Sequence, residues 1–129
     1  MAKTAVHTDG APAPFQGAPY NQAIVSGGFV FVAGQAGLDP ATGKVVDGGI
    51  VPETQQTFDN IEAVLMAAGS SLDRVVKTTV FLADLGEFSA MNGVYAARMG
   101  QPFPARSTVQ AAALPGGAKV EIEVIAEAP

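Results

Sequence analysis

The strongest strand pattern in the sequence begins at Pro102-Phe103-Pro104-Ala105-Arg106-Ser107-Thr108-Val109 and returns at Lys119-Val120-Glu121-Ile122-Glu123-Val124. The first stretch opens a strand directly after closely spaced prolines, and the second alternates apolar and charged residues without a break. Leu114-Pro115-Gly116-Gly117 lies between them. Two strand-like runs joined by a glycine-containing loop predict a β-hairpin with a tight turn.

A hairpin with a loop of about four residues would sort its side chains onto two faces, because successive residues of a strand point in opposite directions. One face is expected to hold Arg106, Thr108, Gln110, Lys119, Glu121 and Glu123, and the other Ser107, Val109, Ala111, Val120, Ile122 and Val124. In this register Glu123 lies nearer than Glu121 to Arg106. The polar face is where we expect function, because it gathers charged groups in a chain with few of them.

Composition narrows the class of protein. The chain has 129 residues, of which 48% are hydrophobic, and this predicts one domain over 1–129 with a substantial core. It has no cysteine, which excludes disulfides and thiolate catalysis, and it shows neither a membrane-spanning run nor the apolar core of a secretory signal, so we expect a cytoplasmic protein. A net charge of −5 disfavours nucleic acid as the main partner. Only 15% of residues are charged, which favours an oligomer that hides part of its surface.

The rest of the chain predicts further elements. Residues 1–21 form an irregular arm, with a short strand around Thr4–His7; His7, the only histidine, is interpreted as an exposed bystander. The sequence predicts a hairpin of Gln22–Ser26 and Phe29–Gly34 that turns at Gly27-Gly28, and a strand over Val75–Leu82. It also predicts a helix over Pro52–Ala68 with an apolar stripe of Phe58, Ile61, Leu65 and Ala68, and a helix from Asp84 to about Met99 with Phe88, Met91 and Tyr95 inward.

Two helices of this length can cover only one face of the sheet, so the pattern predicts an α+β sandwich with an uncovered face. That face has two interpretations. It packs against other subunits with its charges paired across the interface, or it carries a functional site.

Several segments match one known family in order. They are Pro19-Tyr20-Asn21-Gln22-Ala23, Gly34-Gln35, Leu38-Asp39-Pro40-Ala41-Thr42-Gly43, Asn60-Ile61-Glu62-Ala63-Val64-Leu65, Val76-Lys77-Thr78-Thr79-Val80-Phe81-Leu82, Met91-Asn92-Gly93-Val94-Tyr95 and Pro104-Ala105-Arg106-Ser107-Thr108-Val109. The chain resembles the reactive-intermediate deaminase family (Rid, also called YjgF) from about Ala13 to Ala126.

The resemblance implies a chorismate-mutase-like α+β fold, with two helices on one face of a mixed, mostly antiparallel sheet. It also implies a homotrimer around a central barrel, with sites between adjacent subunits. The family hydrolyses enamines and imines of the 2-aminoacrylate and 2-iminobutyrate type to 2-keto acids and ammonia. It requires neither a cofactor nor a metal, and its role is the control of metabolite damage.

The resemblance also assigns site residues. Arg106 would anchor the substrate carboxylate through its planar fork, and Glu121 would orient the attacking water. Tyr20 and Asn92 match a ring-packing position and a polar wall position, while the backbone near Gly34 and Thr108 could supply donors. This chemistry suits a chain without a strong nucleophile, because an imine carbon is already electrophilic and needs mainly placement and water.

The chain departs from the family pattern at three places. Ala18 is inserted before Pro19-Tyr20, Ala33 replaces a frequent serine, and Thr108 replaces a frequent cysteine. These changes leave open a related deaminase in a catabolic pathway, or a non-catalytic trimer that binds small carboxylates. The ribonuclease activity attributed to some members is disfavoured by the acidic composition.

Overall fold

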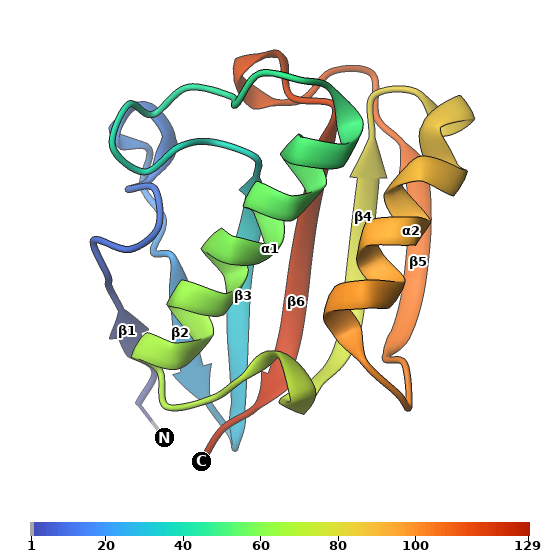
Figure 1. Ribbon diagram of the computed structural model, residues 1–129. Helices are drawn as coiled ribbons and strands as arrows, with labels where there is room; N and C mark the ends of the chain where they lie inside the picture. Colours follow the sequence, from blue (N-terminus) through green and yellow to red (C-terminus); the bar gives the residue numbers. More distant parts are fainter. Residues whose placement is uncertain (1) are drawn as a thin grey trace.

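The computed structural model describes residues 2–129 and shows a mixed six-stranded sheet with two helices against one face (Figure 1). The strands are β1 (Thr4–Val6), β2 (Ala23–Ser26), β3 (Phe29–Ala36), β4 (Val75–Leu82), β5 (Ala105–Gln110) and β6 (Val120–Glu127); the helices are α1 (Ile50–Ala67) and α2 (Phe88–Met99). Short 3-10 turns are η1 (Phe15–Gly17), η2 (Leu72–Arg74), η3 (Leu85–Glu87) and η4 (Pro115–Gly117). The predicted α+β class, with both helices on one face, is confirmed.

Elements with strong local signals form where the sequence predicts them. Gly27 and Gly28 have φ angles of 61° and 85° and join β2 to β3, because a tight hairpin turn needs two residues in the left-handed region. In the predicted stripe of α1, Phe58, Ile61 and Leu65 have no solvent exposure, and Ala68 directly follows the helix and is partly buried. The strand β4 and the short N-terminal strand β1 are also confirmed.

The second helix begins later than predicted. Asp84 accepts a hydrogen bond from the N–H of Gly86 at 2.8 Å and so caps η3, and α2 itself starts at Phe88. Met91 and Tyr95 are buried as expected, whereas Phe88 faces Arg106 of β5 but is 39% exposed, so it is not a core residue. The reason is that β5 is the edge strand, so the first turn of α2 has no further strand to cover it.

The predicted hairpin between the last two strands was also wrong. The strand order is β1-β2-β3-β6-β4-β5, so β4 separates β5 from β6; β5 runs parallel to β4, and β6 runs antiparallel to both β3 and β4. At the end of β4, the N–H of Ala83 donates to Lys119 and the N–H of Ala111 donates to Leu82. The central place of β6 is explained by its buried residues (Val120, Ile122, Val124 and Ala126), which an edge position would leave uncovered.

This topology changes the faces on which the charged residues lie. Arg106 is in register with Thr78, which is in register with Val124, and both neighbours are buried beneath the helices. Glu121 is in register with Phe81, on the opposite, open face. The expectation that Arg106, Thr108 and Gln110 share a face with Glu121 and Glu123 was therefore wrong.

The residues predicted to complete the apolar face are divided in the same way. Ser107 and Val109 lie on the open face, because they are in register with Thr79 and Phe81 of β4. Val120, Ile122 and Val124 lie on the helix-covered face. The prediction failed because both strands take their register from β4 and not from each other.

The open face of the sheet carries large apolar side chains. Phe29, Phe31 and Val109 are 39%, 43% and 46% exposed.

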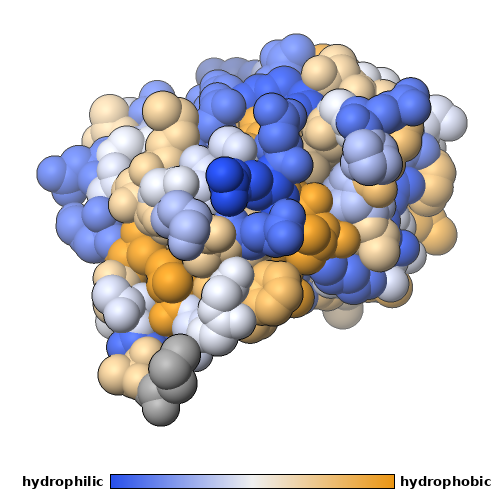
Figure 2. Space-filling model, turned by 90° about the horizontal axis from the view of Figure 1, so that it is seen from below, coloured by the Kyte–Doolittle hydropathy of each residue, from blue (hydrophilic) through white to orange (hydrophobic). Residues whose placement is uncertain are grey.

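Figure 2, seen from the end of the molecule where both termini lie, shows hydrophobic patches beside a hydrophilic cluster, so apolar residues also reach the surface at this end. Across residues 2–129, no helix combines the length and apolarity that crossing a membrane requires.

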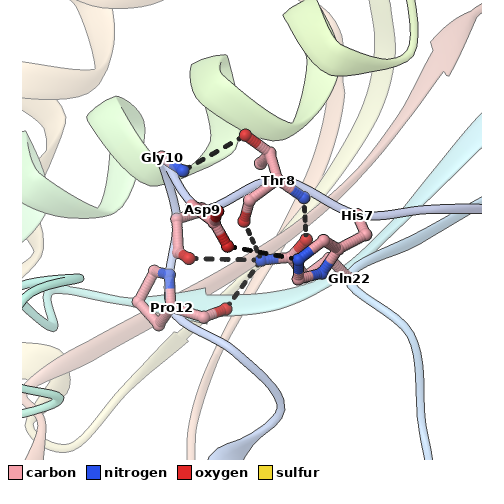
Figure 3. A network of polar contacts seen from close by, with 7 residues as sticks. His7, Thr8, Asp9, Gly10, Pro12 and Gln22 are labelled. Carbon is pink, nitrogen blue, oxygen red and sulfur yellow. Dashed lines mark hydrogen bonds and ion pairs between the residues drawn. The ribbon is translucent and has the colours of Figure 1, made fainter.

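The N-terminal arm is tied to the sheet by one buried amide (Figure 3). Gln22 is 2% exposed; its nitrogen donates to the carbonyls of Thr8, Ala11 and Pro12 at 3.0, 3.2 and 2.9 Å. Its oxygen accepts from the N–H of Thr8 at 2.7 Å. One side chain therefore pairs several backbone groups of a segment that has few regular bonds of its own.

We expect Gln22→Met to lower the free energy of unfolding by roughly 2–4 kcal/mol, because it keeps the length of the side chain but leaves the arm's backbone groups unpaired. Urea denaturation measures the change. His7→Ala is the control, because His7 is exposed and its ring bonds to Asp9, which is also exposed; it should change stability by less than about 0.5 kcal/mol. Equal stability of the two variants would show that Gln22 does not hold the arm.

Candidate active site

Arg106 lies on the edge strand β5 with its guanidinium stacked on two rings of α2. Its central carbon is 4.7 Å from the centroid of the Tyr95 ring and 5.3 Å from that of the Phe88 ring, within the range of cation–π interactions. Within residues 2–129, no carboxylate oxygen lies within 4.0 Å of this guanidinium. The charge is therefore held in place without an anionic partner.

The platform beneath Arg106 is built by helical spacing. Phe88, Asn92 and Tyr95 fall on one face of α2, because residues four and seven apart lie one above another. The Tyr95 hydroxyl is 2.8 Å from that of Thr78 on β4. Burial raises the pKa of Tyr95, against the opposing effects of the Thr78 hydrogen bond and the Arg106 charge, so the phenol stays neutral. Phe88 and Tyr95 were predicted only as core residues, although their spacing with Asn92 is visible in the sequence.

A hollow of about 260 Å³ opens beside Arg106, lined also by Asn92, Tyr95, Ala96, Phe103 and Pro104. In the part of the chain that the structure describes, the side-chain oxygen of Asn92 is buried without a hydrogen-bond partner. Unpaired buried acceptors are uncommon, because they lose hydration without replacing it. Asn92 and Arg106 therefore form one polar wall in an otherwise apolar hollow.

Glu121 lines a second hollow, of about 370 Å³, together with Phe15, Ala18, Tyr20, Ala33, Gly34 and Pro115. Burial raises the pKa of the Glu121 carboxyl, and the neighbouring charge of Glu123 raises it further. A Cβ atom at Gly34 would lie 2.9 Å from the Oε2 atom of Glu121, so only glycine lets the carboxyl lie against β3. The register of β3 shifts between Val32 and Gln35, at the residues that meet this carboxyl.

Tyr20 lines this second hollow, two residues after the alanine that the resemblance marks as inserted. Its hydroxyl accepts a hydrogen bond from the N–H of Phe15 at 2.6 Å, which closes the loop around η1. Ala18 lies in the outer lining of the same hollow. Ala18 and Tyr20 therefore both reach the hollow that Glu121 lines.

The structure divides the predicted site residues into two groups. Tyr20, Gly34 and Glu121 meet in one hollow, and Asn92 and Arg106 in the other; Thr108 follows Arg106 on the same face of β5 but lines neither. The sequence pattern did not point to Phe15, Phe103 or Pro115, whose contacts with the hollows depend on tertiary structure. Within residues 2–129, no group of three or more His, Cys, Asp or Glu side chains could hold a metal ion.

Comparison with known proteins gives the family. Residues 10–128 match the family model described as Endoribonuclease L-PSP, the model of the Rid/YjgF proteins. This chain belongs to the Rid/YjgF family. It is 48% identical over 116 residues to the 2-iminobutanoate/2-iminopropanoate deaminase of Capra hircus, which covers 90% of this chain and 85% of the relative.

Two solved structures are similar to this chain over nearly its whole length. RidA from an Antarctic Psychrobacter has a TM-score of 0.91 at 44% identity, over 96% of this chain and 98% of its own. TdcF of E. coli, described with bound serine, has a TM-score of 0.89 at 34% identity, over 98% of this chain and 99% of its own. The whole fold is therefore shared with the family.

Within a single chain of this Rid/YjgF protein, the Arg106 hollow and the Glu121 hollow cannot face each other. Arg106 lies on the helix-covered face of the sheet and Glu121 on the open face. They also lie three residues apart along the strands, because Arg106 is level with Val124. A ligand held by both residues would have to lie between two chains.

The raised pKa of Glu121 gives a test of its environment. Folding disfavours the ionised carboxylate, so Glu121 lowers the free energy of unfolding at pH values above its folded pKa. This loss of stability disappears at pH values below the unfolded pKa of about 4.3. We expect Glu121→Gln to melt at a higher temperature than the wild type at pH 7.5, with the difference vanishing near pH 4. Thermal unfolding at both pH values, with Glu127→Gln at an exposed position as control, measures it. A difference that is the same at both pH values would contradict this account.

The hydroxyl pair beneath Arg106 gives a second test. In a double-mutant cycle of Thr78→Val and Tyr95→Phe, we expect a coupling free energy of about 1 kcal/mol, because each single change leaves a buried hydroxyl unpaired. Urea unfolding of the four proteins measures the coupling. Additive effects would show that the two hydroxyls do not bond to each other.

Proposed function

We propose that this protein hydrolyses reactive imines and enamines of the 2-aminoacrylate and 2-iminobutyrate type to 2-keto acids and ammonia, at sites between adjacent copies of a homotrimer. The observation that carries the proposal is the Arg106 guanidinium, which is fixed on two rings and has no carboxylate partner within residues 2–129. The names of the goat deaminase and of other relatives support the same reaction.

The carboxylate of a 2-imino acid fits the Arg106 half of the site. A planar guanidinium binds a carboxylate through two parallel charge-assisted hydrogen bonds, which fix the orientation of the bound acid as well as its position. Asn92 lies on the same wall, where its side-chain amide can form a hydrogen bond with the ligand. The bound serine of the related TdcF has the same combination of carboxylate and nitrogen.

The carboxylate of Glu121 in the adjacent copy is the group that activates the attacking water. This carboxylate takes one proton from the water, whose oxygen bonds to the imine carbon while the π electrons of the C=N bond move to nitrogen. The carboxyl then passes that proton to the nitrogen. The resulting carbinolamine loses its hydroxyl proton to the carboxylate, the C=O bond forms, and the C–N bond breaks as ammonia takes up a proton. A carboxyl with a raised pKa suits both transfers, because its ionised form is a stronger base than an ordinary glutamate and its protonated form is still an acid.

The proposed trimer accounts for the open sheet face. Phe29, Phe31 and Val109 would be covered by neighbouring copies around a central barrel. The same arrangement would bring the Arg106 hollow of one chain to the Glu121 hollow of the next. We place this activity in the cytoplasm, on imines released by other enzymes of amino acid metabolism.

A ribonuclease is the function that the description of the family model names. It is not favoured here, because the net charge is −5 and the chain holds 7 lysines and arginines in all. Two of them, Arg98 and Lys119, pair with acidic side chains. RNA binding normally needs a basic surface that neutralises phosphates.

Subunit complementation tests the proposal. Decay of 2-aminoacrylate and 2-iminobutyrate, generated in place by a dehydratase, would be followed with the wild type, Arg106→Ala and Glu121→Gln. We expect each variant to lose activity by about a hundredfold or more, because one loses the anchor and the other the proton-transfer group. A co-refolded equal mixture should regain about a quarter of wild-type activity, because a quarter of randomly formed interfaces join two intact halves.

Each outcome has a distinct meaning. Light scattering must first show trimers for all three proteins. An inactive mixture would place Arg106 and Glu121 outside a shared intersubunit site. Failure of the wild-type trimer to accelerate any imine would reject the deaminase. Serine binding that survives in Glu121→Gln without any activity in the wild type would leave the non-catalytic carboxylate binder.

A further inference from the structure

An inner recess of about 50 Å³ lies behind the Glu121 hollow. Most of its walls are apolar and come from Pro12, Ala13, Phe15, Ala36, Leu38 and Pro115, and Gln35 adds one neutral polar side chain. The recess and the outer hollow have Phe15, Tyr20, Gly34, Pro115 and Glu121 in common, so one opens into the other. Glu121 contributes the charged group of both linings.

The walls of this recess are fixed by buried polar contacts. Asn60 on α1 donates to the carbonyls of Ala36 and Leu38 at 3.1 and 2.9 Å, and these bonds hold the end of β3. The N–H of Lys119 donates to the buried Glu53 carboxylate at 2.8 Å, which fixes the start of β6. Gln22 holds the arm at Pro12. The recess is therefore preformed and does not need a ligand to shape it.

We propose that this recess receives the aliphatic side chain of the imino acid and so selects the substrate. The inference rests on the proposed deaminase function, which places the substrate carboxylate at Arg106 and its reacting carbon at Glu121. The remaining part of the substrate is the side chain, and the recess is the apolar space that adjoins the reacting carbon.

Size and polarity define the class of side chain. One water needs about 10–15 Å³ of such space, so about 50 Å³ accepts a group of a few carbon atoms, up to the isobutyl group of leucine. An anionic side chain is excluded, because it would lie beside Glu121 without a cation. Ala33 adds to this apolar preference, because it places a methyl group instead of a hydroxyl at the mouth.

The test compares imines of different side chains, generated from amino acids by an amino acid oxidase. The measured quantity is the ratio of kcat/KM for the leucine-derived imine to that for the alanine-derived imine. We expect Ala13→Leu, which fills the recess, to lower this ratio at least tenfold. Phe15→Ala, which enlarges the recess while keeping the backbone bond to Tyr20, should raise kcat/KM for the phenylalanine-derived imine at least fivefold.

Ala67→Leu is the matched control, because Ala67 is exposed at the far end of α1 and lines neither the recess nor the hollows. It should leave the ratio unchanged. Wild-type protein should also hydrolyse the glutamate-derived imine at least tenfold less efficiently than the leucine-derived one.

The outcomes separate this inference from the proposed function. Hydrolysis of imines with an unchanged ratio in Ala13→Leu and unchanged phenylalanine-derived activity in Phe15→Ala would overturn the recess assignment alone. Equal or better hydrolysis of the glutamate-derived imine would overturn it as well. A wild-type trimer that accelerates none of the imines would reject the deaminase and the recess assignment together. If Ala13→Leu does not fold, Phe15→Ala and the wild-type substrate series decide.

Discussion

The pairing of β6 with both β3 and β4 is the constraint on which the rest of the molecule depends. This central strand joins the hairpin of the first half of the chain to the β4–β5 pair of the second. Side chains of β6 alternate between the two faces of the sheet. Val120, Ile122 and Val124 enter the core, and Glu121 and Glu123 lie on the open face. The same strand therefore stabilises the fold and presents the carboxylate of the candidate site.

Helix α1 fixes the geometry around that carboxylate from the opposite side of the sheet. Asn60 and Glu53 hold the ends of β3 and β6 through buried hydrogen bonds. The approach is close, because a Cβ atom at Gly37 would lie 2.5 Å from the carbonyl oxygen of Glu53. A helix with no residue in either of the two hollows thus sets the position of Glu121, so substitutions in α1 can alter the site without touching a ligand.

The sequence predicted those parts of the structure whose information is local. The Gly27-Gly28 turn, the stripe of α1 and the strand β4 each depend on neighbouring residues, and all were confirmed. The predicted pairing of β5 with β6 was wrong, because a Leu-Pro-Gly-Gly connection can join two neighbouring strands or two strands that a third strand separates. The amount of apolar surface of β6 that must be buried decides between these two connections, and it depends on the strand order of the whole sheet. The candidate residues came from the resemblance to a family, but their division between two faces followed from the strand order and could not be predicted without it.

The separation of Arg106 and Glu121 onto opposite faces has a consequence for how such a protein behaves in solution. On the proposed assembly, a single chain holds two unmatched halves and is inactive, so turnover per chain depends on protein concentration. Dilution below the dissociation constant of the trimer would remove activity without unfolding any subunit. Activity would then report association directly, and any condition that loosens the contacts between copies would act as an inhibitor although it never enters the site.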